Sequence, residues 1–333
     1  MYTPSWTDSN NRAKASVTIK FRSENPEFRS QNAFSRPRPE SGPENLGILT
    51  SEFYILTPDI YLLNSGLWQR DMTTPSSLQN QVAIITGGGT GIGLAIALRL
   101  GELGARIVVG SRDSKHLEDG TATLRHAGLD PLAVQIDVRK PDQVDEMIER
   151  VLRHFGRIDI LVNNAAGNFI SKAEDLSPNG WNAVVGIVLN GSFYCSRAVG
   201  RQMIARGKGG AIVSVLANYV WTGSPGTIHS AAAKTGVMSM TQTLAVEWAP
   251  HNIRVNAVAP GPIESAGAAK QLWDTPEAVE RITRSVPLGR WGQPSEVADA
   301  VAFLASSHAS FITGEILTID GGARLGRGTF GFV

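Results

Sequence analysis

Short apolar runs alternate with amphipathic helical patterns from Val82 almost to the end of the chain. The runs are rich in β-branched residues and apolar on both faces, as a parallel sheet covered by helices on both sides requires. Predicted strands lie at residues 82–86, 106–110, 132–136, 158–163, 211–215, 253–259 and 315–319. Predicted helices include residues 93–103, 141–155, 178–206 and 230–249. The alternation predicts an α/β fold, with a single doubly wound parallel sheet of about seven strands.

We expect this domain to occupy residues 72–333. The first 71 residues hold several prolines and show no long helical or strand pattern, which indicates a largely disordered extension. Two other interpretations stay open: a true start at Met72, or a transit segment rich in Arg and Ser at 12–38, although such segments avoid the acidic residues present here. We therefore expect a cytoplasmic protein if the source is bacterial, or a mitochondrial matrix protein if a transit segment is present.

Charge and composition exclude several classes of function. The 31 basic and 30 acidic residues give a net charge of +1, which provides no basis for binding nucleic acid or an anionic membrane surface. There is no uninterrupted apolar run of the length that spans a membrane. Cys195 is the single cysteine, so no internal disulfide can form, and we interpret it as a core residue. The six histidines lack ligand spacing, so we expect no metal site.

The stretch IITGGGTGIG follows the first predicted strand and opens a helix. A glycine-rich turn in this place leaves backbone N–H groups at the helix N-terminus free to meet a pyrophosphate, which is typical of a Rossmann-type dinucleotide site. The residues assigned to the cofactor in this turn are Gly87, Gly89, Thr90, Gly91, Ile92 and Gly93.

The residues at the end of the second predicted strand favour NADP(H) over NAD(H) as the cofactor. The second strand ends with Ser111 and Arg112 where an NAD site usually has an acid, and a guanidinium suits the 2′-phosphate of NADP(H). Asp113 then serves as the helix N-cap. Further along, the predicted cofactor contacts are Asp137, Val138, Asn163 and Ala165. Asp137 is expected to accept from the adenine amino group.

These motifs resemble the short-chain dehydrogenase/reductase family. The resemblance rests on the Thr-Gly-x-x-x-Gly-x-Gly pattern at 86–93, the run Asn-Asn-Ala-Ala-Gly at 163–167 and Pro-Gly-Pro-Ile at 260–263, and it covers about residues 78–323. In most of the family a tyrosine precedes a lysine by four residues. This chain keeps the lysine as Lys234 but has Ser230 in the place of the tyrosine.

One branch of the family, the 2,4-dienoyl-CoA reductases of the mitochondrial type, shows the same departure. The chain is similar to that branch in NNAAGNFIS (163–171), in LSPNGWNAVVGIVLNGSF (176–193) and in PGPIESAGA (260–268). There the active tyrosine lies fifteen residues before the lysine, a position that Tyr219 occupies in this chain. The resemblance therefore implies that the acid has moved to another site.

The resemblance implies NADPH-dependent reduction of a 2,4-dienoyl-CoA to a 3-enoyl-CoA, auxiliary to β-oxidation of unsaturated fatty acids, by a homotetramer. The implied catalytic residues are Tyr219, Asn190, Lys234 and Ser230. The loop Pro260, Gly261, Pro262 and Ile263 would contact the nicotinamide. The implied substrate contacts are Arg112, Arg139, Phe169, Asn190, Tyr219, Ser230 and Lys270, with a mobile lid at 264–285. Two alternatives remain: a reductase of another enoyl or carbonyl substrate, and a catalytically silent nucleotide-binding protein.

Overall fold

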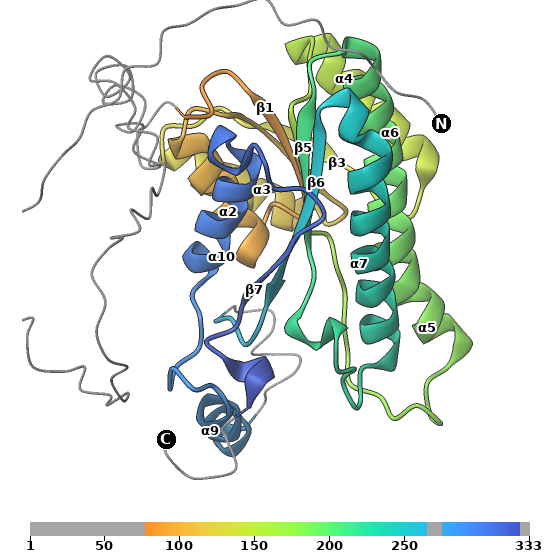
Figure 1. Ribbon diagram of the computed structural model, residues 1–333, viewed down its shortest axis with the longest axis vertical. Helices are drawn as coiled ribbons and strands as arrows, with labels where there is room; N and C mark the ends of the chain where they lie inside the picture. Colours follow the sequence, from red (N-terminus) through yellow and green to blue (C-terminus); the bar gives the residue numbers. More distant parts are fainter. Residues whose placement is uncertain (1–76, 265–274, 327–333) are drawn as a thin grey trace, which may run out of the picture. The chain divides into compact units, whose positions relative to one another are not determined.

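The computed structural model describes residues 77–264 and 275–326. These residues belong to one of two units into which the chain divides, Pro58–Val333. Their strands form one sheet in the order β3-β2-β1-β4-β5-β6-β7, and every neighbouring pair is parallel (Figure 1). The strands are β1 Val82–Thr86, β2 Arg106–Ser111, β3 Leu132–Gln135, β4 Ile160–Asn163, β5 Gly210–Val215, β6 Ile253–Pro260 and β7 Ile316–Ile319. The predicted parallel α/β fold is confirmed.

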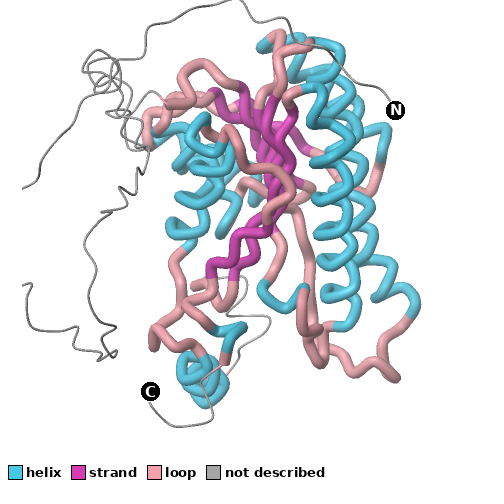
Figure 2. The backbone as a smooth tube through the Cα atoms, in the orientation of Figure 1, coloured by secondary structure: helices cyan, strands magenta, loops and turns pink. Residues whose placement is uncertain are grey.

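Helices cover both faces of the sheet (Figure 2). The main helices are α2 Gly91–Glu102, α3 Ser114–His126, α4 Pro141–Phe155, α5 Pro178–Val185, α6 Gly191–Arg206, α7 Ile228–Trp248, α9 Pro276–Ser285 and α10 Pro294–Ala305. Helices α2, α3 and α10 lie on one face, and α4, α6 and α7 lie on the other (Figure 1). The short β-branched strands are therefore buried on both sides, as their composition predicted.

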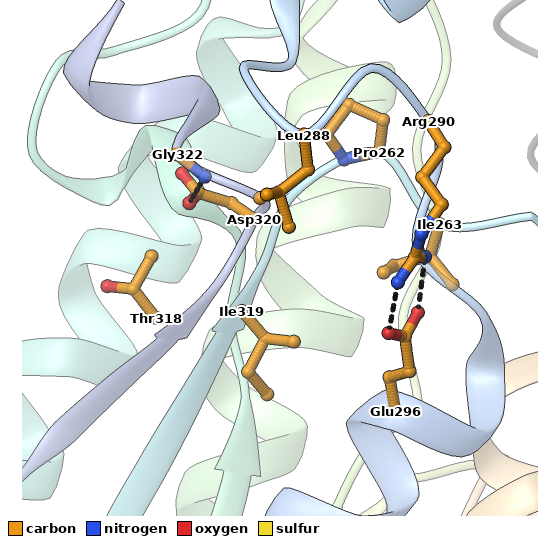
Figure 3. Close-up of a pocket in the computed structure, with 11 residues that line it drawn as sticks. Pro262, Ile263, Leu288, Arg290, Glu296, Thr318, Ile319, Asp320 and Gly322 are labelled. Atoms are coloured by element: carbon orange, nitrogen blue, oxygen red, sulfur yellow. Dashed lines mark hydrogen bonds and ion pairs between the residues drawn. The ribbon is translucent and has the colours of Figure 1, made fainter.

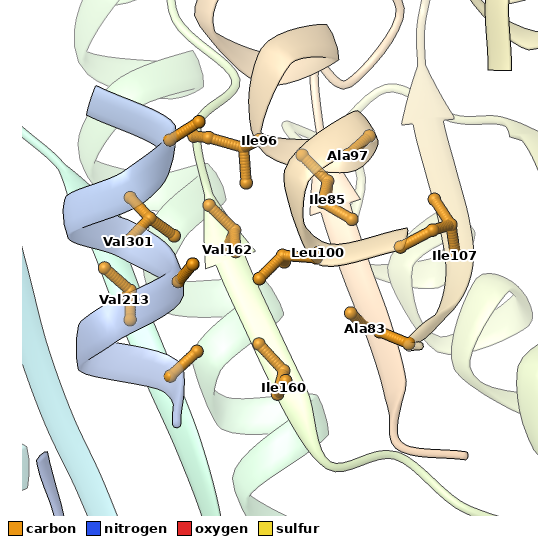
Figure 4. Packing of buried hydrophobic residues seen from close by; sticks show 14 of the residues in the cluster. Ala83, Ile85, Ile96, Ala97, Leu100, Ile107, Ile160, Val162, Val213 and Val301 are labelled. Atoms are coloured by element: carbon orange, nitrogen blue, oxygen red, sulfur yellow. The ribbon is translucent and has the colours of Figure 1, made fainter. Parts of the chain in front are cut away.

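The core is divided by the sheet because successive strand residues point to opposite faces. Ala83 and Ile85 of β1 pack with Leu100 of α2 and Val301 of α10 on one face (Figure 4). The alternate residues Val82 and Ile84 pack on the other face, together with a set that includes Met147, Met203 and Cys195. Burying each large aliphatic side chain contributes about 1.5–3 kcal/mol. Cys195 is a core residue, as predicted, and burial raises the pKa of its thiol to about 12.

The strand order reverses between β1 and β4, since the chain winds outward from β1 through β2 and β3 and then returns to start β4 beside β1. In a doubly wound sheet the crevice outside the carboxyl ends of the strands at this reversal is the usual ligand site. The turn after β1 and the loops after β4, β5 and β6 all leave the sheet at this edge.

The predicted long helix at 178–206 is interrupted by one π-helical turn, Gly186–Asn190, which separates α5 from α6. A Cβ on Gly191 would lie 2.7 Å from Val138 Cγ2, so the helix approaches the loop after β3 closely at this point. Such π turns frequently occur at functional sites. By length and composition the run Pro178–Arg206 could cross a membrane, but half of its apolar window is buried inside the structure, as in the core helix of a globular domain.

Several predictions fall on residues outside the described ranges. The extension or transit segment at 1–71 lies there, as does Lys270. The predicted lid at 264–285 is described only in part, through Glu264 and helix α9. Thr275 caps α9 by accepting a hydrogen bond from the Ala278 N–H at 3.2 Å.

Candidate active site

The glycine turn after β1 is shaped by close backbone contacts. Gly87 has a φ of +64°, which favours glycine. A Cβ on Gly93 would lie 2.3 Å from the Gly87 carbonyl oxygen, so no larger residue fits there. The Asn164 amide donates to the carbonyls of Thr86 and Gly87 at 3.0 and 3.1 Å. Thr90 is the N-cap of α2 and makes no capping bond with its side chain, so the helix N-terminus is available to an anion.

The end of β2 presents a cation to solvent. Asp113 accepts a hydrogen bond from the His116 N–H at 3.0 Å, which confirms its expected role as N-cap of α3. The side chain of Arg112 is exposed and forms no hydrogen bond or ion pair with the residues that the structure describes. A free guanidinium at this position fits a phosphate group.

The end of β3 holds an ion pair that the sequence did not predict. Arg139 Nε donates to both carboxylate oxygens of Asp137, at 2.9 and 3.0 Å, and its Nη2 lies 2.5 Å from Oδ2. Hydrogen bonding from Arg139 lowers the pKa of Asp137. A ligand that contacts the side chain of Asp137 or Arg139 would therefore bind to a group that already takes part in this ion pair. Val138 between them is buried.

The last residue of β4, Asn163, and the residue that follows it, Asn164, direct their side chains to different partners. The Asn163 side chain is buried, and its amide donates to Ser196 Oγ at 2.9 Å, which ties the strand to α6. A cofactor contact from Asn163 would therefore use its backbone. Asn164 points back to the glycine turn, and the N–H groups of Asn164 and Ala165 donate to Thr86 Oγ1 at 3.0 and 3.1 Å.

Tyr219 lies in a short 3₁₀ turn, Asn218–Val220, which begins three residues after the last residue of β5. Its hydroxyl is hydrogen-bonded to Ser230 Oγ at 2.9 Å, so the structure brings together the displaced tyrosine and the serine that stands in the usual tyrosine position. Thr235 Oγ1 also donates to the Val220 carbonyl at 3.1 Å. Burial raises the pKa of Tyr219, while the bond to Ser230 opposes this shift. The phenol is therefore protonated at neutral pH and can donate a hydrogen bond.

Lys234 lies one helical turn beyond Ser230 on the same face of α7. Its side chain is buried, and Nζ donates to the carbonyl of Val215 at the end of β5. Burial lowers the pKa of Lys234 to about 8. A buried amine with one backbone partner retains donors for a ligand hydroxyl.

Asn190 is the last residue of the π turn and is exposed. Its side-chain amide makes no hydrogen bond to the part of the chain that the structure describes. The hydrogen bonds that the structure shows at this turn do not involve it, since the Gly191 N–H donates to the Gly186 carbonyl and Ser192 Oγ donates to the Val188 carbonyl at 2.6 Å. The amide is thus free to act on a ligand.

Phe169 lies beside the start of α7. Its ring packs edge-on against the ring of His229, with centroids 4.4 Å apart, and the Ser171 N–H donates to the Gly226 carbonyl at 2.9 Å. His229 is fully buried, and burial lowers its pKa, so the imidazole is neutral. Phe169 itself is 38% exposed, which leaves apolar surface for a substrate.

The loop after β6 borders a cavity of about 250 Å³, which Pro262, Ile263 and Asp320 help to line (Figure 3). At one wall Arg290 forms a double ion pair with Glu296, with distances of 2.8 and 2.7 Å. That pairing lowers the pKa of Glu296 to about 2. The cavity adjoins the predicted nicotinamide contacts, but Tyr219 does not line it.

Comparisons with known proteins agree with this geometry. A family model described as Enoyl-(Acyl carrier protein) reductase matches residues 87–324. The crystal structure of a short chain dehydrogenase from Bacillus anthracis is 49% identical, with a TM-score of 0.68, covering 73% of this chain and 96% of that one. The chain is a short-chain dehydrogenase/reductase. It is therefore an oxidoreductase of a family that uses NAD or NADP.

Among curated proteins, this short-chain dehydrogenase/reductase is similar to 2,4-dienoyl-CoA reductases of several kingdoms. A probable 2,4-dienoyl-CoA reductase of Bacillus subtilis, named as producing (2E)-enoyl-CoA, is 46% identical over 74% of this chain and 97% of its own length. A peroxisomal 2,4-dienoyl-CoA reductase of Arabidopsis thaliana, named as producing (3E)-enoyl-CoA, is 38% identical over 76% and 87%. The resemblance seen in the sequence is confirmed.

Besides the Asp137–Arg139 ion pair, two further features of this short-chain dehydrogenase/reductase site were not predicted from the sequence. The bonds from Asn164 to the glycine turn were not predicted, although the second asparagine of the 163–167 run signals a polar link there. The contacts of Asn218 and Trp221 with the segment after β7 were also missed. No local sequence pattern predicts these two contacts, because the partners are about 100 residues apart in the chain.

Proposed function

We propose that the chain reduces 2,4-dienoyl-CoA with NADPH, giving a 3-enoyl-CoA. The observation that carries the proposal is the hydrogen bond between Tyr219 and Ser230, which supports a protonated phenol away from the usual tyrosine position but beside the helix that carries Lys234. The names of the curated relatives support the same substrate class. A serine alone at position 230 is too weak an acid for an ordinary carbonyl reductase.

The site residues fit a nicotinamide dinucleotide. The glycine turn packs tightly against α2, since a Cβ on Gly93 would lie 2.3 Å from the Gly87 carbonyl oxygen, and the N-terminus of α2 has no side-chain cap, so its N–H groups would meet the pyrophosphate. Arg112 supplies a free cation for the 2′-phosphate, and Lys234 supplies donors for the nicotinamide ribose. In this proposal the loop at 260–263, at the carboxyl end of β6, meets the carboxamide through its backbone. NADPH, when bound, supplies a hydride.

Tyr219 and Asn190 act on the thioester oxygen in this proposal. Hydride addition at C5 of the dienoyl group moves charge through the conjugated system onto that oxygen, giving a dienolate. Hydrogen-bond donors that meet the developing charge contribute about 3–4 kcal/mol each. The Tyr219 hydroxyl and the Asn190 amide are the two donors, and Ser230 orients the phenol. Phe169 packs against the acyl thioester.

The position of protonation decides the product. Protonation of the dienolate at C2 leaves a 3-enoyl-CoA, whereas protonation at C4 leaves a 2-enoyl-CoA. The relatives' names include both products. We propose protonation at C2 by solvent, which gives the 3-enoyl product that the name of the Arabidopsis relative states.

We further propose that Arg112 and Arg139 contact the CoA phosphates, and that the enzyme is a homotetramer serving β-oxidation of unsaturated fatty acids. Phe193 on α6 and Val246 on α7 are 45% and 77% exposed, so each long helix offers apolar surface to a second subunit. The contact expected from Lys270 and the lid lies outside the described residues.

Purified protein should oxidise NADPH rapidly when a medium-chain trans-2,trans-4-dienoyl-CoA is added, as followed by the absorbance of the reduced nicotinamide. NADH and a simple 2-enoyl-CoA serve as controls, and NMR of the product locates its double bond. Turnover of a non-CoA enoyl or carbonyl compound instead would identify another reductase. Binding of NADPH without turnover of any thioester would point to a silent nucleotide-binding protein.

Replacing Arg112 with alanine should raise KM for NADPH by about 10- to 100-fold, because charge-assisted bonds to the 2′-phosphate contribute about 1.5–3 kcal/mol. KM for NADH should change little, since NADH lacks that phosphate. Steady-state kinetics with both cofactors measure the effect. Arg125→Ala, at an exposed arginine on the following helix α3, is the matched control. Equal losses with both cofactors would contradict the assignment.

A further inference from the structure

The turn that carries Tyr219 is held from two sides. Helix α7 holds it through Ser230 and Thr235. On the other side it meets residues 320–325, called here the 320–325 segment, which follow β7 and include the 3₁₀ turn Ala323–Leu325. The two contacts flank the tyrosine in the sequence, one immediately before it and one two residues after it.

The first contact joins Asn218 to Asp320. Asn218 Nδ2 donates to Asp320 Oδ2 at 3.2 Å. The same carboxylate accepts from the Gly322 N–H at 3.0 Å and from the Arg324 N–H at 2.8 Å (Figure 3 shows the bond to Gly322). The Asp320 carboxylate therefore orders the backbone of the 320–325 segment and also binds the tyrosine turn.

The second contact joins Trp221 to Arg324. The guanidinium carbon of Arg324 lies 4.7 Å from the centroid of the Trp221 ring, within the range of a cation–π interaction. Both side chains are exposed, with Trp221 at 41%. Because Asp320 orders the backbone at Arg324, the first contact supports the second.

The loop after β6 also approaches Asn218 and Asp320. A Cβ on Gly261 would lie 2.6 Å from Asp320 Cβ and 3.4 Å from Asn218 Nδ2. The predicted nicotinamide loop, the tyrosine turn and the 320–325 segment are thus in direct contact. Their relative positions are set together.

We propose that Asp320 and Arg324 are positioning residues for Tyr219. The inference rests on the proposed role of Tyr219 as a donor to the thioester oxygen. A tyrosine in the middle of a helix is held by helical backbone hydrogen bonds on both sides, whereas the turn of Tyr219 has only a few local bonds and the bond from Thr235 to the Val220 carbonyl. The contacts of Asn218 and Trp221 with the 320–325 segment add anchors on the other side of this turn. Small displacements of a reacting group can cost about 100-fold in rate.

The test uses the full-length protein with Arg324→Gln and Asn218→Ala, which each remove one contact. We expect kcat with dienoyl-CoA to fall about two- to fivefold for Arg324→Gln and about fivefold for Asn218→Ala, with KM for NADPH unchanged within about twofold. Arg324→Lys, which keeps the cation, should restore most of kcat. Arg153→Gln, an exposed arginine paired with Glu149 on α4, is the matched control.

A second readout does not depend on the substrate. Hydrogen exchange at the amides of Val220 and Gly223, which donate to the Ala217 and Tyr219 carbonyls, should become about tenfold faster in both variants and stay unchanged in α4. Unchanged exchange, or faster exchange with normal kcat, would overturn the positioning role. Failure of the wild-type protein to reduce any dienoyl thioester would overturn the proposed function instead, and the exchange result would then decide alone whether the segment holds the turn.

Discussion

Replacing Tyr219 with phenylalanine should lower kcat by about 100- to 1,000-fold, because the variant loses one of two donors to the developing oxyanion. The hydroxyl accounts for the effect, since phenylalanine keeps the ring that packs in the turn. Ser230 would lose its 2.9 Å hydrogen-bond partner but remain in place on α7. Rapid-mixing and steady-state assays with NADPH and a dienoyl-CoA measure kcat.

NADPH binding should be unaffected by the same change, because Tyr219 is not assigned to the cofactor. Fluorescence titration with NADPH tests this independently of turnover. Tyr194→Phe on α6 is the matched control and should retain full activity. If Tyr219→Phe keeps normal kcat, the displaced-tyrosine mechanism is wrong.

Replacing Lys234 with methionine should abolish most activity and also stabilise the fold at neutral pH. Loss of the ribose contact misplaces the nicotinamide, for which a loss of at least about 100-fold is expected. Stability should rise because the buried ammonium is costly: burial lowers its pKa from 10.5 to about 8. That shift corresponds to about 3 kcal/mol at pH values below 8. The lost hydrogen bond to Val215 offsets part of the gain.

The pH dependence of this stabilisation has a definite sign. Between pH 8 and 10.5 the unfolded chain holds more protons at Lys234 than the folded chain, so the free energy of unfolding of the wild type rises with pH in this window. The stabilising effect of Lys234→Met should be largest below pH 8 and should disappear near pH 10.5.

Calorimetry at pH 7 and pH 10 measures the difference in Tm, which should be several degrees at pH 7. Lys208→Met, at an exposed position, is the control and should show no pH-dependent difference. A lower Tm for Lys234→Met at pH 7 would contradict the cost assigned to the buried charge. The expected gain in stability with loss of activity is a common compromise at active sites.

The sequence determined the fold to a large extent. Each predicted strand matches an observed one within two residues, because β-branched runs buried on both faces leave few alternatives to a parallel sheet. The glycine turn was predicted equally well from the sequence. Gly87 has a positive φ, which favours glycine, and at Gly93 there is no space for a larger side chain. The spacing of Tyr219 and Lys234 pointed to the displaced tyrosine through family resemblance, as local propensity contains no such information.

Only the tertiary structure decided how the site residues are paired. The ion pair of Asp137 with Arg139, the inward orientation of Asn163 and the contacts of Asn218 and Trp221 with the 320–325 segment depend on where separate strands end in space. Local sequence reports burial and backbone preference, because these depend on neighbouring residues. Hydrogen bonds between distant side chains depend on strand order and register, which arise only when the whole sheet has assembled.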